Sequence, residues 1–245
     1  GHGRPGRIFA PFVATIPKSP EGTGLNSKLS VAIGMAALVI ALAMPGWASA
    51  HPHVFAEATL EVEVGKDRTV ARLGHVWRFD DLFSSTVLLE FDKNQDLELD
   101  EAELEEVASV VHASLAEFNY FQLVTANGKD VAMRAPDRLI ATFEGQQLVI
   151  MFESHPASPL KLYGRIDFGV YDPTFYTAID FTTDDMMMVN GMPADCTRKV
   201  IRPDPDEAIA QNQKTLTDAF FNDSAGTDYS KIFATRLELN CGGKG

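Results

Sequence analysis

Two histidines, His51 and His53, follow the tripeptide Ala48–Ala50 and are separated by a proline. Side chains at i and i+2 of a strand lie on the same face, so this His-x-His pair presents two imidazole nitrogens to one ion. The proline has no backbone N–H, which excludes the copper motif that needs two deprotonated amides. We expect a zinc, nickel or cobalt site at His51 and His53, with the carboxylate of Asp80 as a further ligand.

The residues before these histidines have the layout of a secretory signal peptide. An apolar run without charge, Leu29–Met44, is preceded by a lysine and followed by a Pro-Gly break and the small residues Ala48–Ala50. The run is shorter than the ~20 residues that a membrane-spanning helix needs. We therefore predict cleavage after Ala50, which would give His51 a free amine as one more nitrogen ligand.

The charge of the chain favours cations over nucleic acid. Residues 1–50 contain four of the 21 basic and one of the 34 acidic residues, so the remaining 195 residues carry a net charge of −16. Such a surface repels polyanions and attracts cations. We predict a leader and signal peptide over residues 1–50 and a single periplasmic domain over residues 51–245.

Cys196 and Cys241 are the two cysteines, and both fall in the predicted exported part. An oxidising compartment favours a disulfide between them. Closing a loop of about 45 residues would stabilise the fold by roughly 3–4 kcal/mol in the chain-entropy description. Without a Cys-x-x-Cys spacing, a redox or metal role is disfavoured.

The twelve residues Asp92–Glu103 match the spacing of an EF-hand calcium loop, with side-chain oxygens at positions 1, 3, 5, 9 and 12. The expected ligands are Asp92, Asn94, Asp96, Glu98 (through its backbone carbonyl), Asp100 and Glu103. Leu97 stands where such loops have glycine, and a left-handed leucine costs about 1–2 kcal/mol, so we expect weak calcium binding. The alternative is a helix-turn-helix whose acidic residues cap the second helix.

Two alternating segments, Val54–Val64 and Thr69–Phe79, predict a β-hairpin around the turn Gly65–Arg68. Each segment has one apolar face. A register that sets these faces together is favoured, because a slip of one residue would turn one face outward.

The predicted register has consequences for the histidines. Pairing Val64 with Thr69 places His75 on the core face, about five residues along the strand from His53. The same pairing sets His53 opposite Asp80. We expect His75 to be a hydrogen-bonded core histidine and not a partner of the terminal pair.

The whole pattern predicts an α+β fold: a mostly antiparallel β-sheet, an inserted EF-hand-like helix-loop-helix over about residues 80–118, and a late amphipathic helix over Pro203–Phe221. The later strands are expected at Phe121–Thr125, Arg138–Glu144, Gln147–Glu153, Lys161–Val170 and Lys231–Cys241. The sequence contains no metalloprotease, nucleophile-elbow, phosphate-loop or dinucleotide motif. We therefore predict that the protein is no enzyme.

Several of these segments together resemble the bacterial domain-of-unknown-function family 1007. They are His51–Val54, Val76–Ser84, the acidic loop 92–103, Val170–Tyr176, Cys196 and Cys241. The resemblance implies a periplasmic component of an uncharacterised ABC-type transport system, often paired with a nickel/cobalt-type permease. It also implies a role in acquiring zinc or a related metal.

The leading interpretation is a periplasmic metal-binding accessory that captures a divalent transition metal and passes it to an inner-membrane permease. Zinc is the expected cofactor, with calcium in the loop, and no nucleic acid partner is expected. One alternative is a calcium-stabilised periplasmic scaffold or adhesion module. A second is a copper oxidase or oxygenase using the terminal histidine, which needs another histidine facing it, whereas the predicted register places His75 elsewhere. The metal, the direction of transport, the permease and the oligomeric state stay open.

Overall fold

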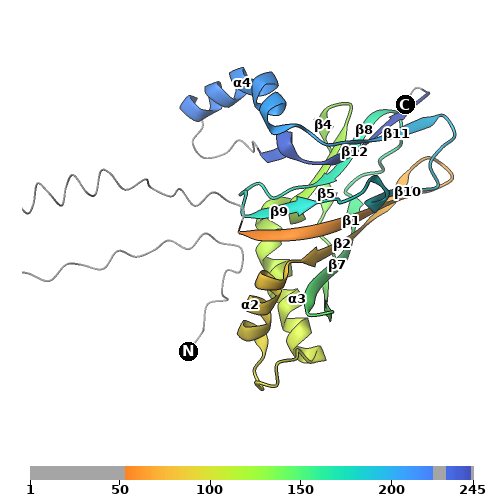
Figure 1. The fold of residues 1–245 in the computed structure, drawn as a ribbon. Coiled ribbons are helices and arrows are strands. Elements are labelled where there is room, and N and C mark those ends of the chain that lie inside the picture. The colour runs from red at the N-terminus through yellow and green to blue at the C-terminus, as the bar shows by residue number, and fades with distance from the viewer. Residues whose placement is uncertain (1–52, 223–229, 244–245) are drawn as a thin grey trace, which may run out of the picture. The chain divides into compact units, whose positions relative to one another are not determined.

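The structure is a computed structural model that describes residues 53–222 and 230–243 (Figure 1). The predicted leader, its cleavage site and His51 lie outside these ranges. Among the described helices, none is both long enough and apolar enough to span a bilayer.

The described chain is a mixture of strands and helices, as the sequence predicts. The strands are β1 (Val54–Val64), β2 (Val70–Phe79), β3 (Gln122–Ala126), β4 (Lys129–Asp130), β5 (Met133–Arg134), β6 (Ile140–Glu144), β7 (Gln147–Pro156), β8 (Gly164–Val170), β9 (Thr177–Asp180), β10 (Met187–Asn190), β11 (Cys196–Ile201) and β12 (Arg236–Cys241). The helices are α2 (Asp81–Phe91), α3 (Glu101–Leu115) and α4 (Pro205–Asn222), with short 3-10 turns η1 (Ala116–Phe121), η2 (Asp184–Met186) and η3 (Ser230–Phe233).

The strands form two sheets instead of the single sheet expected from the sequence. The larger has the order β10-β1-β2-β7-β5, with β6 also pairing with β7 and β9 with β1. The smaller has the order β11-β12-β8-β3-β4. Pairing is mainly antiparallel, as predicted, although β1 pairs in parallel with both β9 and β10. The buried faces of both sheets share one hydrophobic core, so the alternation along each strand reports burial but not sheet membership.

The first hairpin forms, but the predicted register is wrong by two residues. Ala56 lies opposite Phe79 and Val62 opposite Leu73, and the register shifts between Glu63 and Val64. The turn is one residue longer than predicted, since Val64 pairs with Val70, and a bulge beside it adds the second residue. A shift of two keeps every side chain on its predicted face, so hydrophobic pattern alone does not exclude it.

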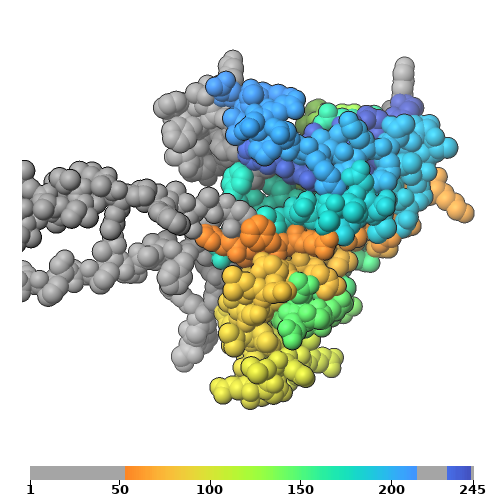
Figure 2. All heavy atoms as spheres, in the orientation of Figure 1, coloured from red at the N-terminus to blue at the C-terminus, as the bar shows by residue number. Residues whose placement is uncertain are grey.

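Helices α2 and α3 occupy the predicted insertion and begin at aspartate caps. The Asp80 carboxylate accepts the Phe83 N–H, and Asp100 forms a capping box with Glu103. In Figure 1 this helix pair lies on one side of β1, and β8, β11 and β12 lie on the other. Figure 2 shows the orange surface of β1 between the yellow helix pair and the cyan and blue strands.

The predicted disulfide is confirmed. Cys196 and Cys241 lie directly opposite each other on β11 and β12, and their sulfur atoms are bonded. The bond joins the last strand of the chain to the edge of the smaller sheet. A disulfide is consistent with an exported protein.

Candidate functional site

Three strand ends meet at one end of the larger sheet. Because β9 runs parallel to β1 and β2 runs antiparallel to it, the starts of β1 and β9 lie beside the end of β2. His53 immediately precedes β1, Tyr176 precedes β9, and Asp80 follows β2. Segments far apart in the sequence therefore bring a histidine, a tyrosine and a carboxylate to one region.

The backbone on the β9 side holds His53 in place. The N–H groups of His53 and Val54 both donate to the carbonyl of Tyr176, at 2.9 and 3.2 Å. The rings of His53 and Tyr176 lie 5.5 Å apart between centroids, and His53 is exposed. The imidazole thus stands at the surface on an ordered backbone.

Asp172 builds the loop that presents this carbonyl. Its Oδ1 accepts the N–H and the hydroxyl of Thr174, both at 2.7 Å, and its Oδ2 accepts the N–H of Thr177 at 2.8 Å. The carboxyl group is buried and holds the chain on both sides of Tyr176. In the sequence, this segment contributes to the family resemblance, but no structural role was expected of Asp172. The signal was present in Asp172-Pro-Thr174, since aspartate before such residues often forms a turn with its own backbone.

Asp80 does not face His53 as predicted. Its Oδ2 accepts the N–H of Phe55 at 2.8 Å and its Oδ1 accepts the N–H of Phe83 at 2.9 Å. The two-residue register difference is the reason, because it sets Asp80 beside Phe55. Its carboxylate therefore ties the start of α2 to the start of β1, two residues from His53.

The donor set at this end is incomplete within the described residues. Residues 53–222 and 230–243 contain no group of three or more histidine, cysteine, aspartate or glutamate side chains arranged to hold a metal ion. His53 is an imidazole nitrogen donor, which suits borderline divalent metals. The other predicted nitrogen donors belong to His51, outside the described part of the chain.

In the loop between α2 and α3, side-chain oxygens accept backbone N–H groups. Asp92 Oδ2 accepts the Leu97 N–H at 2.8 Å, and Asn94 and Asp96 each accept the N–H two residues ahead, at 2.9 and 3.0 Å. Glu103 joins both ends of the loop by accepting the N–H groups of Lys93 and Asp100, at 2.7 and 3.0 Å.

Leu97, the sixth residue of the loop 92–103, has a φ of 67°. This is the left-handed conformation expected at position 6 of an EF-hand calcium loop. Its side chain is 67% exposed and makes no contribution to the core. The loop therefore adopts the backbone that glycine favours even though leucine occupies the position.

His75 lies in the core, as predicted. It is 2% exposed, its Nε2 is 3.1 Å from the hydroxyl of Ser154, and its ring stacks on Phe152 at 4.3 Å. Burial lowers the pKa of His75 to about 3, so the ring is neutral at physiological pH. Within the described chain, its Nδ1 has no hydrogen-bond partner.

The fold and this site define a class of α+β protein with two mainly antiparallel sheets, one disulfide and an inserted helix pair. The chain belongs to the family described as "Protein of unknown function (DUF1007)", whose family model matches residues 36–241. An uncharacterised protein of Haemophilus influenzae is 24% identical over 197 residues, which cover 78% of this chain and 91% of that protein.

Proposed function

We propose that this chain is a periplasmic metal-binding accessory that captures zinc, nickel or cobalt and passes it to an inner-membrane permease of the nickel/cobalt type. His51 and His53 bind the ion with the amine of His51, and Asp80 assists by fixing the neighbouring backbone. The protein performs no catalysis in this account.

The observation that carries the proposal is the position of His53. Its imidazole is exposed at an ordered strand end, held through Tyr176 and the buried carboxylate of Asp172. A donor on an ordered backbone loses less conformational freedom when it binds an ion than a donor on a loose tail. The net charge of the exported part further favours cation capture.

Processing at Ala50 is the first test of this proposal. We expect the intact mass of the exported protein to correspond to a chain that begins at His51, because cleavage there creates the amine ligand. A variant that retains Ala50 ahead of His51 should bind zinc more weakly, since its amine is displaced by one residue. A natural start at any other residue would contradict the proposed ligand set.

A second candidate function, a calcium-stabilised scaffold, is favoured by the conformation of the loop 92–103. The φ of Leu97 and its N–H bond to Asp92 match what an EF-hand-like loop requires at position 6. We propose that Asp92, Asn94, Asp96, Glu98, Asp100 and Glu103 bind calcium weakly. In the leading account, this ion stabilises the helix pair and leaves the transition-metal site unchanged.

Replacing Leu97 with glycine should tighten calcium binding about tenfold, by relieving ~1–2 kcal/mol of backbone strain. Calorimetric titration of the parent and of Leu97→Gly measures the difference. Leu97→Ala is the control, because alanine keeps the strain of a positive φ and removes only the exposed side chain. Absence of calcium binding in both the parent and Leu97→Gly would reduce the loop to a connection between helices.

A further inference from the structure

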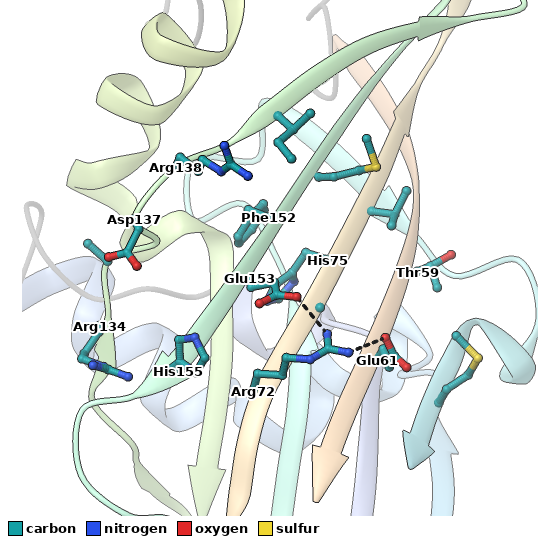
Figure 3. Close-up of a pocket in the computed structure, with 16 residues that line it drawn as sticks. Thr59, Glu61, Arg72, His75, Arg134, Asp137, Arg138, Phe152, Glu153 and His155 are labelled. Atoms are coloured by element: carbon teal, nitrogen blue, oxygen red, sulfur yellow. Dashed lines mark hydrogen bonds and ion pairs between the residues drawn. The ribbon is translucent and has the colours of Figure 1, made fainter. Parts of the chain in front are cut away.

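A groove with a volume of about 630 Å³ lies on the solvent-facing side of the larger sheet, beneath the segment between β5 and β6 (Figure 3). Strand β5 pairs with β7 at residues 155–156 and β6 pairs with it at 147–151. Among the described ladder pairs, none joins the intervening segment 135–139 to β7. The sheet edge therefore opens here, and the groove is lined partly by Phe152 and His75 from the core face.

Two arginines at the rim of this groove have no partner within the described chain. Arg134 and Arg138 line the groove and are exposed, and neither side chain forms a hydrogen bond or ion pair with a described residue. The other described arginines, Arg68, Arg72, Arg78, Arg165, Arg198, Arg202 and Arg236, all bond to a carboxylate or a backbone carbonyl. In a chain with an excess of carboxylates, these two unpaired guanidinium groups both face one groove.

The segment that carries the two arginines is anchored to the body of the protein. The carbonyl of Pro136 accepts a hydrogen bond from His112 Nε2 of α3 at 2.8 Å, and Pro136 and Leu139 are buried. Anchoring between Arg134 and Arg138 fixes the backbone from which both side chains extend. A ligand then has to order the two side chains but not the segment that carries them.

The floor of the groove carries carboxylates that are already neutralised. Arg72 lies 3.5 Å from Glu61 and 3.3 Å from Glu153, in the strands on either side of it. Gly74 leaves room for this bridge, because a Cβ there would lie 3.1 Å from the Arg72 guanidinium. The negative charge on the floor is therefore partly compensated, and the rim, with Arg134, Arg138 and Asp137, keeps a net positive charge.

The remaining lining is apolar and exposed. Val76, Ile140 and Met188 line the groove and are 37%, 42% and 41% exposed. Such clustered exposed side chains mark surfaces that bind apolar groups. The floor also meets His75, whose buried Nδ1 has no partner in the described chain and requires a hydrogen-bonding group from water or a ligand.

We propose that this groove binds a linear organic dianion of the dicarboxylate class, with one carboxylate at Arg134, the other at Arg138 and an apolar body over the floor. Figure 3 shows the two arginines at opposite ends of the rim, with Asp137 between them. The rim from Arg134 to Ile140 spans four residues of β7, roughly 13 Å at ~3.3 Å per residue. Separated cations of this kind select a ligand with two acidic ends over a ligand with one.

The test compares suberate with octanoate, which have the same chain length but two acidic ends and one. Calorimetry on the mature protein should show suberate binding about tenfold more tightly, because a second hydrogen bond to a charged group adds about that factor. Arg134→Gln and Arg138→Gln should each bring the two affinities close together. Lys129→Gln removes a positive charge outside the groove and should leave the ratio unchanged.

Equal affinities in the parent, or a ratio unaffected by both arginine variants, would overturn the assignment. Failure of suberate, succinate and octanoate to bind, together with capture of an acidic peptide by the parent, would overturn it in favour of a protein partner. The affinity ratio of suberate to octanoate is measured on the same protein sample. A partial loss of folding lowers the active concentration for both ligands equally, so it does not change this ratio. His53→Ala should leave the ratio unchanged, because His53 is not among the residues that line the groove.

Discussion

Replacing both His51 and His53 with alanine should weaken zinc binding by more than about 100-fold. Loss of an outer-shell partner alone costs about 10–100-fold at metal sites, and this variant removes two direct ligands. Competition against a chromogenic chelator measures the affinity of the parent and of the double variant. Calcium binding should be unchanged, since the loop 92–103 shares no ligand with these histidines.

His155→Ala is the matched control, because His155 lies on β7 away from His53 and its Nδ1 donates to the carbonyl of Ala71 at 2.8 Å. It should bind zinc as the parent does. Affinity in the parent should also fall as the pH drops through the histidine range, because the bound imidazoles must be neutral. A double variant that holds zinc as tightly as the parent would place the site elsewhere.

Acidification should destabilise the parent more than a His75→Gln variant, by about 2 kcal/mol between pH 7 and pH 5. Burial lowers the pKa of His75 from 6.5 to about 3 in the folded protein, whereas the unfolded chain keeps the ordinary value. Between these two values the unfolded state binds the extra proton. The contribution of neutral His75 to the free energy of unfolding is therefore fully present above pH 6.5, and it is lost progressively as the pH falls toward 3.

Urea unfolding of both proteins at pH 7 and pH 5 gives the difference directly. Glutamine retains an amide that reaches toward Ser154 but does not titrate, so the comparison isolates the proton on His75. A lower stability of the variant at pH 7 leaves the test intact, because the two pH slopes are compared. Identical slopes would mean that His75 is solvated or is protonated in the folded state.

Period-2 alternation predicted which residues of the first hairpin are buried, but not its register. Leu60, Val62 and Leu73 lie in the core as expected. The register difference sets Asp80 beside Phe55, and on the other edge of β1 His53 bonds to Tyr176, a residue more than one hundred positions away in the chain. Parallel pairing of β1 with β9 is a non-local contact, and alternation within either strand contains no information about it.

The sequence alone points to His53 as a candidate donor, but not to the residues that hold it in place. His53 follows from a local spacing, and the helix pair around residues 92–103 follows from caps and apolar stripes. The role of Asp172 depends on its burial beside Thr177, which only the folded chain creates. The side chains of Arg134 and Arg138 lack partners because the segment between β5 and β6 does not pair with β7, which the sequence alone does not reveal.

Metal analysis of the protein purified from periplasm, together with the sequence of its amino terminus, decides whether His51 and His53 form a metal site. We expect a chain beginning at His51 that contains about one equivalent of zinc, nickel or cobalt, and that loses this metal when His51 and His53 are replaced. A chain that begins at His51 yet contains none of these metals, and takes up none when they are supplied, would contradict this expectation.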